Sequence, residues 1–200
     1  MQNEMSKLYK QIQNLLIKLV PDNWNSIYLY ASVMYGKKGE MYFYYFPKKI
    51  IKANPINCYE IADKFGIEES TYEKSLKKLY EYIKELNHVM GKKWTNLTIM
   101  VEENLFTIEY HFNDLIHSKY NDEQRRMIWC YKYLRIPLES MNLNDRMMVE
   151  NYKEESNIKP LIYTETIEYE DEEESGNNLN NYEHKTNSEN ATIRNPFLKI

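Results

Sequence analysis

Cysteine, glycine and proline are scarce in this chain, and long apolar runs are missing. The 200 residues include two cysteines, five glycines and six prolines. Cys58 and Cys130 lie far apart and form no C-x-x-C pair. The sequence therefore predicts neither a metal knuckle nor a disulfide framework, and we expect both thiols to be reduced. No stretch approaches the roughly 20 consecutive apolar residues that span a bilayer, so we expect no membrane partner.

The N-terminal segment 1–13 is polar, whereas a signal peptide would need an apolar run of about 7–15 residues. We therefore expect the protein to stay in the cytoplasm. A chain of 200 residues with 42% hydrophobic and 14% aromatic content can bury one sizeable core but hardly two. One domain is the expectation.

Short catalytic motifs are also missing. The sequence contains no G-x-G-x-x-G, P-loop, H-E-x-x-H or G-x-S-x-G pattern. Of the four histidines, only His111 and His117 lie close together, and their spacing does not suit two ligands of one metal on a helix. We predict no enzyme, no cofactor and no metal site. A metal-dependent hydrolase that uses these histidines with neighbouring carboxylates is the alternative, although a solvated sheet face would carry the same carboxylates: Glu102, Glu103, Glu109 and Asp114.

Charge divides the chain into two parts. Residues 1–160 hold 23 basic and 21 acidic side chains, whereas residues 161–200 hold 3 and 9. A nearly neutral body does not favour direct nucleic-acid binding, which needs clustered Lys and Arg. Nothing in the sequence indicates a small-molecule substrate.

Hydrophobic periodicity predicts the secondary structure. Apolar residues at helical spacing predict helices over 5–19, 57–66, 70–90, 121–137 and 145–155, with capping boxes at Asn57/Glu60, Ser70/Glu73 and Asn121/Gln124. Alternating residues predict strands over 27–35, 41–46, 97–102 and 106–112. Gly36 and Gly39 are expected to supply positive φ angles in the connection between the first two strands.

Two β-hairpins that are separated and flanked by helices predict an α+β domain, in which an antiparallel sheet packs against helices. Such a sheet can leave its second face free. We assign residues 1–158 to the domain and residues 159–200 to an acidic, Asn-rich tail that is disordered alone. Within that tail, residues 160–169 have some β-propensity.

The 19 tyrosines are the most distinctive feature of the composition. Four of them, Tyr28, Tyr30, Tyr42 and Tyr44, fall on the strand face that points away from the expected helices. Tyrosine is common in interface hot spots because it offers a large contact area with few rotatable bonds. The same tyrosines would also be expected if a second layer of helices covers this face, or if an AT-rich coding bias favours Tyr, Asn, Ile and Lys.

A continuous acidic run lies in the tail: Glu170, Asp171, Glu172, Glu173 and Glu174. One interpretation is a solubilising segment. The second is a mimic of nucleic-acid phosphates that occupies the basic groove of a nuclease, where opposite charges also accelerate association.

Several segments, in their order along the chain, resemble the YezG-like immunity proteins, a family that includes EsaG-type antitoxins. The segments are Leu8-Tyr9, Trp24-x-x-Ile27-Tyr28-Leu29-Tyr30-Ala31, Phe43-Tyr44-Tyr45, Trp94-Thr95-Asn96-Leu97-Thr98 and Glu123-Gln124-Arg125-Arg126-x-Ile128-Trp129-x-Tyr131-Lys132-Tyr133-Leu134. The resemblance covers residues 1–155, and the extension beyond residue 160 departs from it.

This resemblance implies an antitoxin that binds the nuclease domain of a toxin exported by the type VII secretion system, and so protects the producing cell. It assigns no catalytic residue and no motif position that contacts the toxin. On the residues alone, we place toxin binding at the four tyrosines and the acidic run. A secretion chaperone or adaptor, which would hold the toxin soluble without blocking its activity, is the alternative function.

Overall fold

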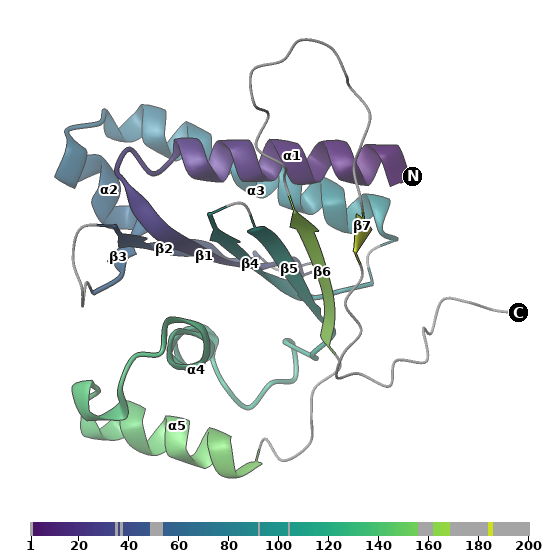
Figure 1. Ribbon diagram of the computed structural model, residues 1–200. Coiled ribbons are helices and arrows are strands. Elements are labelled where there is room, and N and C mark those ends of the chain that lie inside the picture. The colour runs from purple at the N-terminus through teal and green to yellow at the C-terminus, as the bar shows by residue number, and fades with distance from the viewer. Residues whose placement is uncertain are drawn as a thin grey trace, which may run out of the picture.

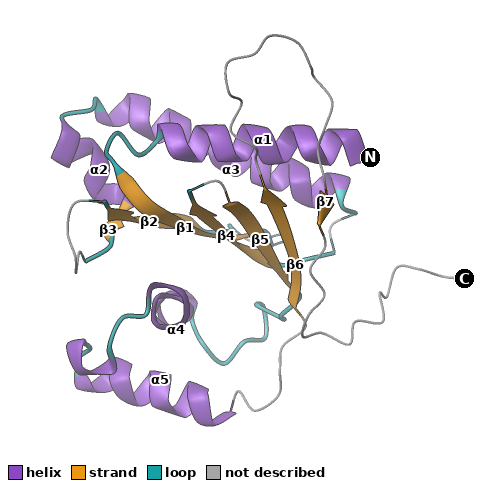
Figure 2. Ribbon diagram, viewed as in Figure 1, coloured by secondary structure: helices purple, strands orange, loops and turns teal. Residues whose placement is uncertain are grey.

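The computed structural model describes residues 2–34, 36, 38–48, 54–91, 93–103, 105–155, 162–168 and 184–185. The helices are α1 (Gln2–Lys18), α2 (Cys58–Phe65), α3 (Glu69–Val89), α4 (Asp122–Leu134), the 3-10 turn η1 (Leu138–Ser140) and α5 (Leu143–Glu155). The strands are β1 (Trp24–Ser32), β2 (Met41–Pro47), β3 (Ile56–Asn57), β4 (Asn96–Glu102), β5 (Leu105–His111), β6 (Ile162–Glu168) and β7 (His184–Lys185). The fold is α+β, as predicted (Figure 2). None of the described helices combines the length and apolarity needed to cross a membrane.

The strands form one antiparallel sheet in the order β3-β2-β1-β4-β5-β6-β7. The two predicted hairpins, β1–β2 and β4–β5, are confirmed. Pairing between β1 and β4 joins them into one surface. Helices lie on both sides of this sheet: α1 and α3 on one face, and α4 and α5 on the other (Figure 1).

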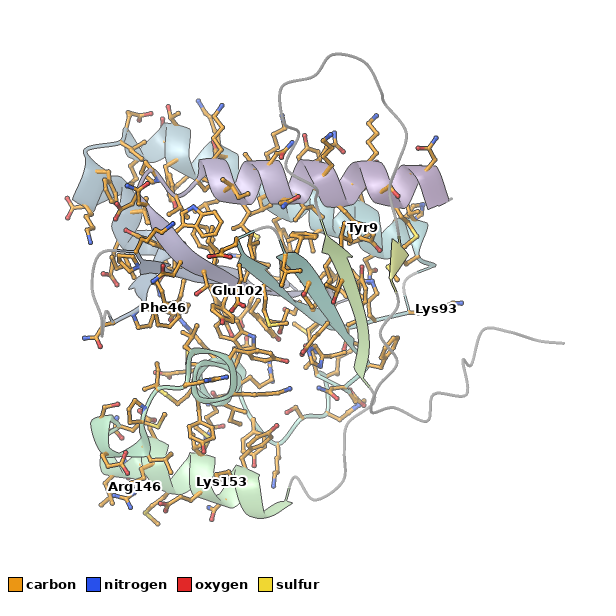
Figure 3. The ribbon with its side chains drawn as sticks, in the orientation of Figure 1. Tyr9, Phe46, Lys93, Glu102, Arg146 and Lys153 are labelled. Carbon is orange, nitrogen blue, oxygen red and sulfur yellow. The ribbon has the colours of Figure 1, made fainter. Side chains whose placement is uncertain are left out.

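The face toward α1 and α3 is apolar because alternate strand residues are apolar. Eleven of its strand side chains are fully buried: Ile27, Leu29, Ala31, Phe43, Tyr45, Leu97, Ile99, Val101, Phe106, Ile108 and Tyr110. Leu8, Ile12 and Leu16 of α1, one helical turn apart, are buried with them. The Tyr110 hydroxyl donates a hydrogen bond to the Tyr9 hydroxyl at 3.1 Å, so the polar tips of two buried rings satisfy each other. Side chains fill the space on both sides of the sheet (Figure 3).

One of the three predicted capping boxes is confirmed: Asn121 and Gln124 form the reciprocal box of α4. Asn57 is the N-cap of α2 as predicted, but its side chain accepts from the amide of Tyr59 rather than that of Glu60, so the predicted box with Glu60 is wrong. The Ser70/Glu73 box is wrong. Helix α3 begins one residue earlier, and the Glu68 carboxylate instead accepts from the amides of Ser70 and Thr71. A carboxylate before the first turn satisfies two free amides at once and complements the helix dipole.

The connection between β1 and β2 uses its glycines in two ways. Gly36 has the expected positive φ of 73°. Gly39 does not. It is needed because a Cβ there would collide with the Tyr80 hydroxyl and the Ser32 carbonyl, which are hydrogen-bonded at 2.9 Å. Close backbone approach, rather than a left-handed conformation, explains this glycine.

Part of the assigned tail belongs to the sheet. Residues 162–168 form β6, which pairs with β5 along its whole length, in line with the β-propensity of residues 160–169. The acidic run 170–174 and the rest of the tail apart from β7 lie outside the described residues.

Candidate functional site

The sheet face toward α4 carries the four predicted tyrosines in an ordered grid. Strand register places side chains of neighbouring strands opposite one another, so the grid has four rows. The first row is Ser32, Asn96 and His111, and the second is Tyr42, Tyr30, Thr98 and Glu109. The third row is Tyr44, Tyr28, Met100 and Thr107, and the fourth is Phe46, Ser26, Glu102 and Leu105.

Exposure to solvent changes sharply between the second and third rows. In the second row Tyr42, Tyr30 and Thr98 are buried and Glu109 at its end is half-buried, and all three residues of the first row are buried. Every residue of the third row is half-buried, and Leu105 in the fourth row is 41% exposed. The sheet face that the sequence suggested to be free is therefore largely covered over its first two rows and partly accessible over the other two. Tyr30 and Tyr42 lie beneath a second layer of helices, which the sequence left open as the alternative to a binding surface.

Trp129 of α4 is the main contact over the second row. The centroid of its ring lies 5.3 Å from the ring centroid of Tyr42 and 6.1 Å from that of Tyr30, and both contacts are edge to face. Its indole Nε1 donates a 3.0 Å hydrogen bond to the buried Thr98 Oγ1. Edge-to-face packing and a satisfied indole N–H make this an ordered contact that holds α4 against the sheet.

Arg126 lies one helical turn before Trp129 and links the second row to the third. Its guanidinium carbon lies 4.9 Å from the ring centre of Tyr42 and 5.7 Å from that of Tyr44. Its Nε and Nη2 donate to the Tyr44 hydroxyl at 3.1 and 2.8 Å. Burial raises the pKa of Tyr44 to about 12, so its hydroxyl is neutral at physiological pH. Arg126 thus holds Tyr44 in place by cation–π and hydrogen-bond contacts together.

A polar network fills the end of this interface near β5. The Tyr133 hydroxyl donates to the Glu109 carboxylate, lies 3.3 Å from His111 Nε2 and accepts from Lys132 Nζ at 2.9 Å. Burial, with a smaller effect of Lys132, lowers the pKa of His111 to about 4, so the imidazole is neutral at pH 7. Beside this network lies a hollow of about 350 Å³ between the sheet, α4 and Tyr152 of α5.

The residues considered for metal chemistry form two pairs rather than one cluster, since His111 Nε2 lies 3.8 Å from the Glu109 carboxylate. His117 pairs at the surface with Asp114 at 2.7 Å, and its side chain is 82% exposed, whereas His111 is buried in the network with Tyr133. Among the described residues, no group of three or more His, Cys, Asp or Glu side chains is placed to hold a metal ion. Cys58 and Cys130 are buried free thiols.

We call five aromatic and aliphatic residues of the third and fourth rows the open patch: Tyr28, Tyr44, Phe46, Met100 and Leu105. Tyr28 and Phe46 pack edge to face at 5.9 Å. The Tyr28 hydroxyl donates to Glu102 at 2.6 Å, and burial together with this carboxylate raises the pKa of Tyr28 to about 12. The patch is therefore an aromatic and aliphatic surface in which Tyr28 is held by Phe46 and Glu102. The exposed carboxylate of Glu102 lies at its rim.

Sequence reasoning placed Tyr28 and Tyr44 together with Tyr30 and Tyr42, but the structure divides them between open and covered rows. It missed the roles of Arg126 and Trp129, although their spacing of three residues on one predicted helix was a usable signal. It also missed Phe46, Met100 and Leu105, because only strand register shows that they share a surface with Tyr28.

The segments that carry the family resemblance have structural roles. Trp94 is buried against Tyr110 at 5.6 Å, and its carbonyl accepts from the Asn87 side chain at 2.9 Å. The segment from Glu123 to Leu134 supplies contacts of α4 with the sheet through Arg126, Trp129 and Tyr133. These motifs therefore specify how the two helical layers pack.

Comparison with known proteins gives one consistent family. The family model described as "Immunity protein YezG-like" matches residues 5–149. Immunity protein YezG of Bacillus spizizenii is 31% identical over 155 residues, which cover 74% of this chain and 92% of the relative. Immunity protein YezG of Bacillus subtilis is 27% identical, over 66% of this chain and 89% of the relative.

A third relative comes from another genus. Type VII secretion system protein EsaG of Staphylococcus aureus is 22% identical over 161 residues, which cover 77% of this chain and 96% of the relative. The family model covers well over half of the chain, and the motif segments from Leu8 to Leu134 fall within its limits. The chain belongs to the YezG-like immunity protein family.

Proposed function

We propose that this protein is an antitoxin that binds and inhibits the nuclease domain of a type VII secreted toxin in the cytoplasm of the producing cell. Family membership is the observation that carries the proposal. The name of the staphylococcal relative, a type VII secretion system protein, supports the link to that export route. The partner is therefore a protein, and the mode of action is binding rather than catalysis.

The open patch is the surface we assign to toxin binding. Tight inhibition requires slow dissociation, which depends on well-packed aromatic anchors more than on rim charges. Tyr28, Tyr44 and Phe46 supply such anchors and are partly accessible. Tyr30 and Tyr42 contribute indirectly. They pack against Trp129, Tyr42 also contacts Arg126, and Arg126 holds Tyr44 in position. The exposed Glu102 at the rim suits a basic partner such as a nuclease.

The acidic run 170–174 is an auxiliary contact in this proposal. It begins two residues after the end of β6, and β6 ends opposite Leu105 of the open patch. Negative charge tethered there would attract the basic groove of a nuclease and raise the association rate. Association that is independent of salt concentration would remove this role.

Affinity purification from native cells, followed by a nuclease assay of the recovered partner, tests the function. We expect a partner whose nuclease activity this protein abolishes at equimolar ratio. A partner that keeps full activity in the complex would instead support the secretion chaperone. Recovery of no nuclease would overturn the proposal.

Alanine substitution of Tyr28 and Phe46 tests the surface. We expect each to weaken inhibition by about 2 kcal/mol, or roughly 30-fold in Kd, as for aromatic hot spots. Tyr82→Ala is the matched control, because Tyr82 is a half-buried tyrosine on α3, across the sheet. Equal Kd values for all three variants would exclude the open patch.

A further inference from the structure

Strand β6 occupies an edge that the rest of the domain leaves open. β5 pairs with β4 on one side and with β6 on the other, over seven residues from Leu105 to His111. The family match ends at residue 149, before β6 begins. An uncovered β5 would present a row of unpaired backbone groups, which is a template for another strand.

The two described side chains of β6 are less buried than the core residues of β5. Phe106, Ile108 and Tyr110 of β5 are fully buried. In β6, the described side chains of Thr166 and Ile167 are only half-buried, and Ile167 is the one that packs against the core. Thr166 meets Thr107 at 3.4 Å through their hydroxyl oxygens. Backbone pairing with β5 runs over all seven residues of β6, and another extended segment can supply the same hydrogen bonds.

We propose that the β5 edge is a docking site for an extended strand of the toxin, and that β6 covers this edge until the toxin displaces it. The proposal rests on the function proposed above and names a second part of the same interface. Leu105 belongs both to β5 and to the open patch, so a toxin seated on the patch lies beside this edge.

Charge favours a basic strand as the occupant. The sequence of β6, Ile-Tyr-Thr-Glu-Thr-Ile-Glu, carries two acidic residues and no basic one. It ends beside the row that holds the exposed Glu102. A strand with Lys or Arg would keep the backbone pairing and add opposite charge at this rim, which β6 does not do.

A reversible covalent lock tests displacement in the full chain. Thr107 and Thr166 are directly opposed, so Thr107→Cys with Thr166→Cys can form a disulfide of ordinary geometry. We expect the oxidised protein to bind the purified nuclease domain at least about tenfold more weakly than the same protein after reduction. Mass spectrometry checks which cysteines are linked, because Cys58 and Cys130 are also present, although buried. Equal affinity of the two forms would overturn the proposal.

A loosening variant should act in the opposite direction. Ile167→Ala removes the apolar contact that Ile167 of β6 makes with the core and should raise the association rate several-fold. Hydrogen exchange gives the direct readout: in the complex, amides of residues 162–168 should lose protection while those of 105–111 keep it. Continued protection of both segments would show that β6 stays in place.

The outcomes separate this proposal from the proposed function. A locked protein that still inhibits the nuclease fully would exclude the strand site but leave the antitoxin assignment intact. A reduced, unlocked protein that binds no nuclease would refute both. Concentration-dependent dimers of Ile167→Ala, with no gain in nuclease binding, would assign the edge to a second copy of this chain instead and so contradict the proposal.

Discussion

The two faces of the sheet differ in composition and in cover. The face toward α1 and α3 is apolar and covered by helices, and most of its strand residues, from Ile27 to Tyr110, are fully buried. The face toward α4 is aromatic and polar, with buried Thr98, Asn96 and His111 beneath the helix and half-exposed rings beside it. One set of strands thus supports two different interfaces.

From this difference we expect one face to contribute mainly to stability and the other mainly to binding. A closed apolar face contributes stability through burial of area and close packing. A face with satisfied polar groups and partly exposed rings contributes less stability but offers directional contacts to a partner. Variants on opposite faces of the same strand should therefore separate folding from binding.

Neighbouring residues of β5 give the largest expected contrast. Phe106 is fully buried toward α1 and α3, and Leu105 is 41% exposed in the open patch. Phe106→Ala should lower the free energy of unfolding by about 3–5 kcal/mol through cavity formation. Leu105→Ala should lower it by less than about 1 kcal/mol. Urea unfolding monitored by circular dichroism measures both.

Toxin binding should show the reverse order for this pair. Under conditions where both variants are folded, Leu105→Ala should weaken binding and Phe106→Ala should not. A loss of affinity confined to Phe106→Ala would mean that the closed face transmits its packing to the interface, and the proposed division would fail.

The covered rows of the α4 face should be sensitive to acid. The folded-state pKa of His111 is about 4, against about 6.5 in an unfolded chain. Between these values the unfolded state binds more protons, so stability falls as pH drops from about 6.5 to about 4, by roughly 3 kcal/mol at most. Unfolding measured at pH 7, 5.5 and 4.5 should show this slope, and His111→Gln should reduce it. An identical slope in the variant would assign the acid sensitivity to carboxylates.

Sequence patterns predicted elements better than surfaces. The alternation in 27–35 and 97–102 identified strands because burial of one face imposes a period of two. The Asn121/Gln124 cap located the start of α4 because that motif is local. Whether α4 covers Tyr30 or Tyr28 is not local. It depends on the position of a helix about 90 residues away in the chain, relative to the strand register.

The buried polar groups show the same limit of sequence patterns, which do not reveal contacts between distant parts of the chain. His111 was a candidate ligand because only its spacing from His117 was visible. Its partner in space is Tyr133, on a different element. Residues 162–168 gave only a weak strand signal, because their pairing with β5 depends on backbone hydrogen bonds that residue types do not reveal.

A smaller effect than that of Phe106→Ala is expected for the hydrogen bond that joins Trp129 of α4 to Thr98 of the second row. Trp129→Phe removes the indole donor and leaves the fully buried Thr98 hydroxyl without it, which should destabilise the fold by about 1–3 kcal/mol. Adding Thr98→Val replaces that hydroxyl with a methyl of similar shape and should recover part of the loss. The coupling in this double-mutant cycle, measured by urea unfolding, decides whether the bond fixes the helix layer. Additive effects would mean that this hydrogen bond adds nothing to the packing of the Trp129 ring against Tyr30 and Tyr42. The polar contribution to the α4 interface would then come from the hydrogen bonds of Arg126 and Tyr133 with the sheet.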